Sequence, residues 1–198
     1  METTLHKSPT KEKILGSAIK LMLVRGFTAT SVDDIVRDAG ITKGSFFHFF
    51  ESKEALAMAA LERFVRDQYA KLESAPFNKE RDPVKRVMGR IDTTIALLRD
   101  PMIKLKSCLI GNFSQELAPT HSGFQSLCAE KFSQMSKAFV RDLKAAGVKD
   151  ASHVCDMYFS LIQGSMILMK AKSDHSIATN NLKLFKEYLK GRMKGLKL

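Results

Sequence analysis

The sequence predicts an all-α fold of about nine helices, and three observations lead to this prediction. Apolar residues recur every three or four positions along most of the chain, and no segment alternates between polar and apolar residues as a strand does. Only 5 of the 198 residues are Pro and 11 are Gly, which is few for a turn-rich β-sandwich. Apolar residues make up 44% of the chain, so it can bury a substantial core.

Four helices are expected before residue 75. Each follows a Ser or Thr whose side-chain oxygen can accept a hydrogen bond from the free N–H groups of a first helical turn. The four expected caps are Ser8, Ser31, Thr42 and Ser52. Gly26 and Gly40 are expected to end the first and second helices, because glycine tolerates the backbone conformations found there. The second and third helices are short and cover residues 32–39 and 43–49.

Five more helices are expected after a linker at residues 75–79. Asp82 and Pro83 start the first of them as cap and first-turn proline, and Pro101 breaks it. The next two are expected at about residues 105–117 and from Thr120 to a stop at Gly147. The eighth helix is expected over residues 154–169, after a cap at Asp150 or Ser152, and the ninth from beyond residue 179 to residue 193.

Residues 31–56 carry most of the functional information. A short helix, a tight turn at residues 40–42 and a second short helix follow one another, which is the layout of a helix-turn-helix. The second short helix opens with small and polar residues from Thr42 to Ser45. A helix that enters the DNA major groove needs such an uncluttered N-terminal end, because its side chains and N–H groups must reach bases and phosphates.

This segment resembles the DNA-binding motif of the TetR family of bacterial transcriptional repressors. The positions that align with the family pattern, in order and without gaps, are Ser31, Ile35, Ala39, Gly40, Ile41, Thr42, Gly44, Phe46, Phe47, Phe49, Phe50, Ser52, Lys53, Glu54 and Leu56. The resemblance is strong over residues 10–58. It implies a DNA-binding domain in residues 1–54 and an effector-binding and dimerisation domain in residues 55–198.

The motif supplies the candidate DNA-binding residues, which are Ser31, Thr42, Lys43, Gly44, Ser45, Phe47, His48 and Lys53. Lys43 and Ser45 are the best candidates for base edges, because a lysine ammonium can reach the acceptors of guanine. The resemblance makes Lys53 a phosphate clamp, whereas a lysine at a helix start is otherwise usually a solvated residue. The three aspartates of residues 32–39 repel DNA and are expected to point away from it.

Two positions depart from the family pattern. The usual Tyr, whose hydroxyl contacts a phosphate, is Phe47 here, and the usual His is Phe49, with His48 beside it. Phe47 cannot donate a hydrogen bond, so this phosphate contact is lost or comes from His48. Phe46 and Phe50 are four residues apart and are expected in the core. Phe47 is expected to contact sugar or a thymine methyl group, and stacking on single-stranded bases is the rival interpretation.

The later helices are expected to form the effector-binding and dimerising body. Residues 154–169 are apolar nearly all round, which is unusual for a surface helix of a monomer. By resemblance, this helix and the last one pair with their copies in a homodimer; the alternative is a core helix of one subunit. Candidate pocket residues lie on the apolar stripes, where most residues are simply core, and are Met88, Ile91, Ile95, Cys108, Phe113, Phe124, Phe132, Tyr158 and Gln163.

Cys108 differs from the other two cysteines, which lie on apolar stripes and are expected to be inert. Residues 106–112, followed by Glu116, resemble a subgroup of TetR-like regulators with a cysteine at the head of this helix, some of which sense electrophiles or oxidants. A helix N-terminus and the nearby Lys104 and Lys106 favour a reactive thiolate. The alternative is that Cys108 packs as a small apolar residue.

Other classes of protein receive little support. Cys108 and His121 offer a nucleophile and a base, but the sequence supplies no orienting third group or oxyanion site. The five His show no metal-ligand spacing with Cys, and no Gly-rich phosphate loop is present, so neither a metal nor a cofactor is expected. Residues 154–169 are shorter than the ~20 residues that a membrane span needs. The net charge of +11 is spread along the chain and marks no single face.

The sequence therefore predicts a cytoplasmic DNA-binding regulator, most simply a repressor that a small-molecule effector releases from its double-stranded operator. Such a mechanism needs two states, and the effector must bind better to the state in which the two recognition helices leave their one-turn spacing. A thiol-based sensor repressor that uses Cys108 is the alternative, and a Cys-dependent enzyme is a more remote one.

Overall fold

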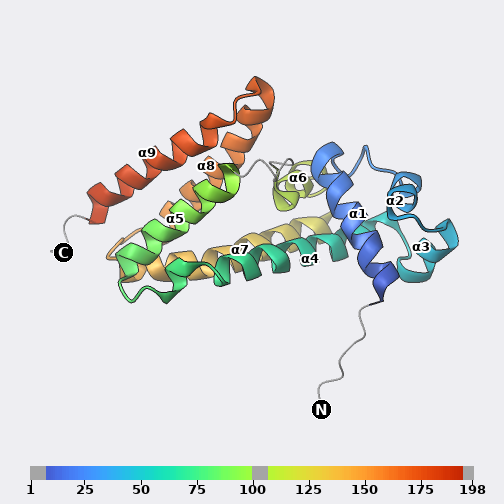
Figure 1. Ribbon diagram of the computed structural model, residues 1–198, viewed down its shortest axis with the longest axis horizontal. Helices are drawn as coiled ribbons and strands as arrows, with labels where there is room; N and C mark the ends of the chain where they lie inside the picture. Colours follow the sequence, from blue (N-terminus) through green and yellow to red (C-terminus); the bar gives the residue numbers. More distant parts are fainter. Residues whose placement is uncertain (1–7, 100–106, 194–198) are drawn as a thin grey trace, which may run out of the picture. The chain divides into compact units, whose positions relative to one another are not determined.

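The computed structural model describes residues 8–99 and 107–193, and within these ranges it contains nine α-helices and no strand (Figure 1). The all-α prediction is confirmed. The helices are α1 (Pro9–Arg25), α2 (Val32–Ala39), α3 (Lys43–Phe49), α4 (Lys53–Glu73), α5 (Pro83–Arg99), α6 (Leu109–Glu116), α7 (Ser122–Ala145), α8 (Ala151–Lys172) and α9 (Ser176–Met193), with a short 3₁₀ helix, η1 (Pro76–Lys79), inside the predicted linker. None of the helices in the described ranges is long and apolar enough to cross a bilayer.

The predicted end signals of the first helices are confirmed. Ser8 accepts a hydrogen bond from the first turn of α1, and Gly26, at φ +84°, ends that helix. Ser31 and Asp34 form a reciprocal capping box at the start of α2. Gly40, at φ +64°, ends α2 in the left-handed conformation, which lets the chain turn at once into α3.

Four helix starts differ from the prediction, and one of them is that of α8, which begins at Ala151 rather than at residue 154. α6 begins at Leu109 rather than near residue 105, and the predicted break at Pro101 lies outside the described residues. α7 begins at Ser122 rather than at Thr120, because the N–H groups of residues 120 and 121 still bond to the carbonyl of Leu117 in the preceding turn. α9 begins at Ser176, inside the predicted connection, because the Asp174 carboxylate accepts its first N–H at 2.8 Å.

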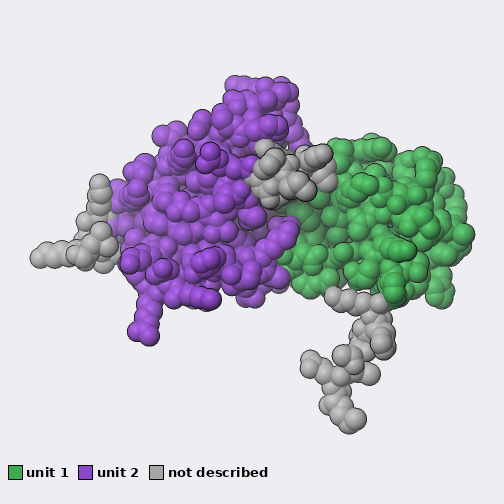
Figure 2. Space-filling view, in the orientation of Figure 1, with its two compact units in different colours: residues 1–67, 107–131 green, residues 68–106, 132–198 purple. Residues whose placement is uncertain are grey.

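The chain forms two compact units (Figure 2). Unit 1 comprises residues 1–67 and 107–131, and unit 2 comprises residues 68–106 and 132–198. α4 and α7 each run through both units. Unit 1 therefore contains α6 and the first half of α7 in addition to the first three helices. The boundary expected between residues 54 and 55 separates proposed functions and does not coincide with these units.

Each unit has its own apolar core. In unit 1 the first helices and the start of α4 bury Ile14, Met22, Ile35, Phe46 and Leu56 completely. In unit 2 the buried core joins α5, α7, α8 and α9. Burial of apolar surface is the main stabilising contribution in both units, at roughly 25 cal/mol per Å² removed from water.

Candidate nucleic-acid interface

α2 and α3 form a helix-turn-helix within unit 1. Ile35 of α2 and Phe46 of α3 are fully buried, so the two short helices are held by the core beneath them. The turn between them is closed by the Ile41 N–H, which bonds to the carbonyl of Val36 at 3.0 Å. The expected burial of Phe46 and Phe50 is confirmed.

The N-terminal end of α3 is open to solvent. Thr42 caps the helix through its side-chain oxygen, which accepts the Ser45 N–H at 3.2 Å and lies 2.9 Å from the Ser45 hydroxyl. Lys43 and Gly44 are exposed, and a Cβ added to Gly44 would meet only the Thr42 side chain at 3.9 Å. This end of α3 therefore combines a capped helix terminus with small side chains, which suits close approach to a nucleic-acid backbone.

α3 also exposes two aromatic side chains, those of Phe47 and His48. Phe47 is 51% exposed, and its ring stands edge-on to the buried ring of Phe46, with centroids 5.1 Å apart. His48 is exposed and packs in the same way against Phe49, at 4.8 Å. α3 thus exposes an apolar ring and an imidazole at successive positions.

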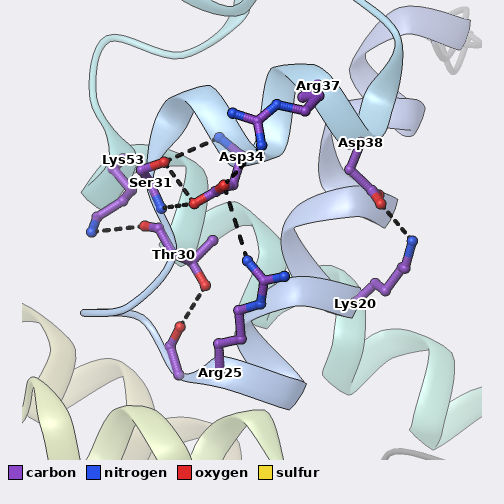
Figure 3. Close-up of polar contacts among 9 residues, drawn as sticks. Lys20, Arg25, Thr30, Ser31, Asp34, Arg37, Asp38 and Lys53 are labelled. Atoms are coloured by element: carbon purple, nitrogen blue, oxygen red, sulfur yellow. Dashed lines mark hydrogen bonds and ion pairs between the residues drawn. The ribbon is translucent and has the colours of Figure 1, made fainter.

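The aspartates of α2 are all paired. Asp34 accepts hydrogen bonds from Ser31 and lies 3.6 Å from Arg37 and 4.0 Å from Arg25, and Figure 3 shows these partners around its carboxylate. Hydrogen bonding with Ser31 is the main cause of a lowered pKa at Asp34. Each carboxylate is therefore partly offset by a neighbouring donor or cation.

The other two aspartates pair with lysines. Asp38 bonds to Lys20 of α1, which is the main cause of the lowered pKa of Asp38 (Figure 3). Asp33 instead pairs at 3.0 Å with Lys43 of α3, and both side chains are more than half exposed. Such an exposed ion pair contributes only about 0–1 kcal/mol, so the Lys43 ammonium can exchange this partner for another at little cost.

Lys53 lies in a different environment from the one that its position at a helix start suggests. Its ammonium donates to the carbonyls of Phe27 and Thr30, each at 3.1 Å, and stands 4.0 Å above the centre of the Phe27 ring (the bond to Thr30 is drawn in Figure 3). An ammonium has three N–H groups, so one remains for another acceptor. Lys53 thus ties the start of α4 to the loop between α1 and α2.

α6 holds the same loop through contacts that the sequence reasoning missed. The Glu116 carboxylate accepts the N–H groups of Phe27 at 3.1 Å and Thr28 at 2.9 Å. One turn earlier, the Asn112 side-chain amide donates to the carbonyl of Met22 at 3.1 Å. The spacing of four residues between Asn112 and Glu116 was the available signal, since it places both polar groups on one face of a helix.

Cys108 is the N-cap residue of α6 and is partly buried. It lies one turn before Asn112, whose N–H bonds to the Cys108 carbonyl at 2.9 Å. Lys104 and Lys106, which were expected to act on this thiol, lie outside the described residues. Burial raises the pKa of the other two cysteines, Cys128 and Cys155.

The candidate pocket residues are divided between the two units. In unit 1, Phe113 and Phe124 pack edge-on against each other at 5.7 Å and both contact the ring of Phe27, so they join α6 and α7 to the α1–α2 loop. Cys108 is also in unit 1, while unit 2 holds the remaining candidates, namely Met88, Ile91, Ile95, Phe132, Tyr158 and Gln163. That these residues line an effector pocket stays a prediction.

The last two helices keep apolar side chains on the surface. α8 buries one face, which includes Tyr158 and Met169, in the core of unit 2. Its other side and the exposed side of α9 carry large exposed apolar residues, which are Met157, Ile167, Leu168, Leu184 and Tyr188. In the part of the chain that the structure describes, no atom lies within 4 Å of where a Cβ on Gly164 of α8 would be.

A capped helix-turn-helix with an open second helix defines a DNA-binding protein of the helix-turn-helix class. Comparison with known families agrees. Residues 14–60 match the model of bacterial regulatory proteins of the tetR family, and residues 83–178 match the C-terminal domain of LmrA/YxaF-like transcriptional regulators. The chain therefore belongs to the TetR family of transcriptional regulators.

Individual relatives agree with this assignment. The HTH-type transcriptional repressor DhaR of Mycobacterium sp. (strain GP1) is 31% identical over 135 residues, or 68% of this chain and 66% of DhaR. The repressor NemR of Escherichia coli is 44% identical over 54 residues, 27% of each chain. Among solved structures, the reduced form of E. coli NemR has a TM-score of 0.78 at 21% identity, over 91% of this chain and 96% of that one. The structure of a TetR regulator from Legionella pneumophila has a TM-score of 0.79 at 22% identity, over 93% of this chain and 99% of that one.

Proposed function

We propose that this TetR-family regulator is a homodimeric repressor that binds operator DNA through the N-terminal end of α3 and leaves it when a small-molecule effector binds. The observation that carries the proposal is the open, capped start of α3. There Lys43, Gly44 and Ser45 are accessible, while the carboxylates of Asp34 and Asp38 are held by partners.

Each exposed group on α3 has a distinct role in this proposal. Lys43 and Ser45 read base edges, and the N–H groups beside Gly44 approach a phosphate. Phe47 contacts sugar or a thymine methyl group, and His48 supplies the hydrogen bond that Phe47 cannot donate. Ser31 and Thr42 contribute first as helix caps, which orient α2 and α3 on the DNA.

Signal transfer to the DNA-binding helices is proposed to pass through α6. Asn112 and Glu116 hold the end of α1 and the loop that leads into α2. An effector that favours another position of α6 would have to break or move these hydrogen bonds, and α2 and α3 would follow the loop. A shift in population requires only that the effector bind one state better than the other.

The dimer is proposed to form through α8 and α9. The exposed apolar side chains of these two helices, among them Ile167 and Leu184, form the kind of surface that a second subunit covers. The open space beside Gly164 leaves room for a partner helix at close distance. Gly164→Arg would place a charge in this interface and is expected to yield monomers or aggregates, as sedimentation at micromolar concentration would show.

A thiol switch at Cys108 is the second candidate for the trigger. Cys108 is partly exposed at the head of the helix that carries Asn112 and Glu116, so a modification there would act directly on the α6 contacts. Graded labelling with a thiol reagent tests this. The switch predicts that Cys108 reacts faster than Cys128 and Cys155 and that Cys108→Ser no longer releases DNA on oxidation. If Cys108→Ser releases DNA normally, the effector is non-covalent.

Selection from fragmented genomic DNA at low salt tests the regulator proposal itself. The expected result is enrichment of fragments with two half-sites about one helical turn apart, because two recognition helices of a symmetric dimer bind with that spacing. Failure to enrich any duplex would overturn the proposal and would favour the alternative of an enzyme.

A further inference from the structure

Arg90 is a buried cation in unit 2. It lies on α5 between Val87 and Ile91, on the apolar stripe of that helix, and its side chain is only 6% exposed. Burial lowers the pKa of the Arg90 guanidinium, because the charged form loses its hydration. A buried charge is normally paired with a carboxylate or bound by several hydrogen-bond acceptors.

Among the described residues, no carboxylate lies within ion-pair distance of Arg90, and its buried Nε atom has no hydrogen-bond partner. The guanidinium instead faces two rings, with its central carbon 5.1 Å from the centre of Phe77 and 5.5 Å from that of Phe139. Gly89 allows the close approach on the Phe77 side, since a Cβ there would lie 2.5 Å from the Phe77 Cβ.

The nearby carboxylate of Asp142 is already used by two other arginines. Asp142 is fully buried, and its Oδ1 accepts from Arg86 at 3.0 Å and from Arg141 at 3.3 Å. Its Oδ2 is buried and has no hydrogen-bond partner within residues 8–99 and 107–193. Two guanidinium groups thus hold the Asp142 carboxylate, whereas the guanidinium of Arg90 has no carboxylate within ion-pair distance among the described residues.

Two hydroxyl groups lie beside Arg90. The Thr94 hydroxyl donates to the Arg90 carbonyl at 3.1 Å and lies 2.6 Å from the Tyr158 hydroxyl. Since a hydroxyl has one proton, Tyr158 is the donor in that pair. Burial raises the pKa of Tyr158 to about 12, so it remains a neutral donor at physiological pH. Its ring also packs against Phe139 at 4.8 Å.

We propose that Arg90 is the anchor of an anion-binding site in unit 2 that takes the carboxylate of a small apolar monocarboxylic acid, with Phe77 and Phe139 against its apolar part. The unpartnered Nε of Arg90 supplies the attraction for an anion, and the two rings select an apolar body. This proposal rests on the proposed function and adds to it the chemical class of the effector.

A purely structural role for Arg90 and a ligand-binding role predict opposite effects of its removal on the stability of the ligand-free protein. If a water bridges Arg90 Nε and Asp142 Oδ2 and the network exists to hold the fold, removing the guanidinium must lower stability. If the charge is held for a ligand, replacing it with an apolar side chain of similar length removes an uncompensated buried charge and leaves the ligand-free protein at least as stable.

Thermal unfolding of the full-length protein separates the two roles. The variants are Arg90→Met, Arg90→Lys, which keeps the charge, and Arg141→Gln as a control on an exposed arginine of the same cluster. The probes are benzoate and hexanoate, each compared with its uncharged amide at the same concentration and ionic strength. Isothermal titration with each acid gives the dissociation constants, and binding to a selected operator fragment is measured separately, both without probe and with each acid.

The wild type is expected to gain about 3–5 °C in Tm at a concentration of acid ten times its dissociation constant, with no gain from the amides. Arg90→Met should keep or raise the ligand-free Tm and lose at least tenfold in affinity for the acids. The affinity of Arg90→Lys should lie between those of the wild type and Arg90→Met. Arg141→Gln should bind the acids as the wild type does. Equal effects of acid and amide, no effect of either acid, or a large fall in the ligand-free Tm of Arg90→Met would overturn the proposal. Acid binding without DNA release would keep the site and count against the effector role instead.

Discussion

The Glu116 carboxylate and the Thr28 backbone N–H form a hydrogen bond of 2.9 Å between the end of α6 and the loop that leads into the helix-turn-helix. The other carboxylate oxygen accepts the N–H of Phe27 at 3.1 Å. One carboxylate thus satisfies two successive N–H groups of a loop that has no helical partners for them. The arrangement connects the DNA-binding helices to α6 within a single compact unit.

Glu116→Gln is expected to lower the free energy of unfolding by about 2 kcal/mol, because hydrogen bonds to a charged acceptor contribute roughly 1.5–3 kcal/mol. The amide group of Gln has one oxygen to accept a hydrogen bond, and its NH₂ group then faces another donor. Urea unfolding measures the difference. Glu130→Gln, at an exposed position of α7 in the same unit, is the matched control and should change stability by less than about 0.5 kcal/mol. Equal stability of the two variants would contradict the role of Glu116.

Gly26→Ala is expected to be more damaging than Gly40→Ala. Gly26 has φ +84° and ψ 174°, a region open essentially to glycine alone, and an added Cβ would lie 2.4 Å from a Glu116 oxygen. Gly40 is left-handed, and no described atom lies within 4 Å of its Cβ position. Gly40→Ala should therefore cost only the backbone strain of a left-handed alanine, about 1 kcal/mol of unfolding free energy. In a Glu116→Ala background, Gly26→Ala should cost less than in the wild type. Additive effects in this double-mutant cycle would show that the two residues do not interact.

Lys53→Met is expected to lower both stability and the salt dependence of DNA binding. Two carbonyls lose their charged donor, which should cost about 2 kcal/mol of unfolding free energy in denaturant titrations. The third N–H is proposed to bind a phosphate, so the slope of log K against log salt should fall in magnitude by about 0.9 per subunit. A stability loss with an unchanged slope would leave Lys53 as a structural residue only.

Gly44→Ala is expected to separate folding from DNA binding. A Cβ at Gly44 meets nothing closer than 3.9 Å, and alanine favours a helix over glycine by about 1 kcal/mol, so stability should rise or stay constant. The added methyl group lies at the proposed contact with the DNA backbone and should weaken operator binding at least tenfold, as fluorescence anisotropy would show. Wild-type affinity in this variant would place the DNA elsewhere on the protein.

The lowered pKa of Asp34 predicts that its contribution to stability is lost in acid. Hydrogen bonds from Ser31 lower the pKa of Asp34 in the folded protein below its ordinary value of 3.8. The contribution is therefore fully present above the unfolded-state pKa of about 3.9 and is lost as pH falls through the folded-state pKa. The difference in urea midpoint between wild type and Asp34→Asn should shrink from pH 6 to pH 2.5. Ser31→Ala should reduce this pH dependence, and a constant difference would contradict the assignment.

Local sequence was sufficient for the fold class and for the helix-turn-helix. Ser31, Gly40 and Thr42 act through hydrogen bonds and backbone angles within four residues, so their roles follow from sequence spacing alone. The apolar repeat likewise identified Phe46 and Phe50 as core residues. The start of α7 was misplaced, because Thr120 resembles a cap but its N–H completes the preceding turn.

Contacts between distant segments depended on the tertiary structure. Lys53 lies 23 and 26 residues, and Glu116 lies 88 and 89 residues, from the loop residues that they bind, and no local pattern distinguishes such partners from solvent. The role of Arg90 was likewise missed. Its position on the apolar stripe of α5 can be inferred from the sequence, but the lack of a paired carboxylate among the described residues cannot. Helix ends are set by bonds between near neighbours, whereas burial and pairing of charges depend on which helices the fold brings together.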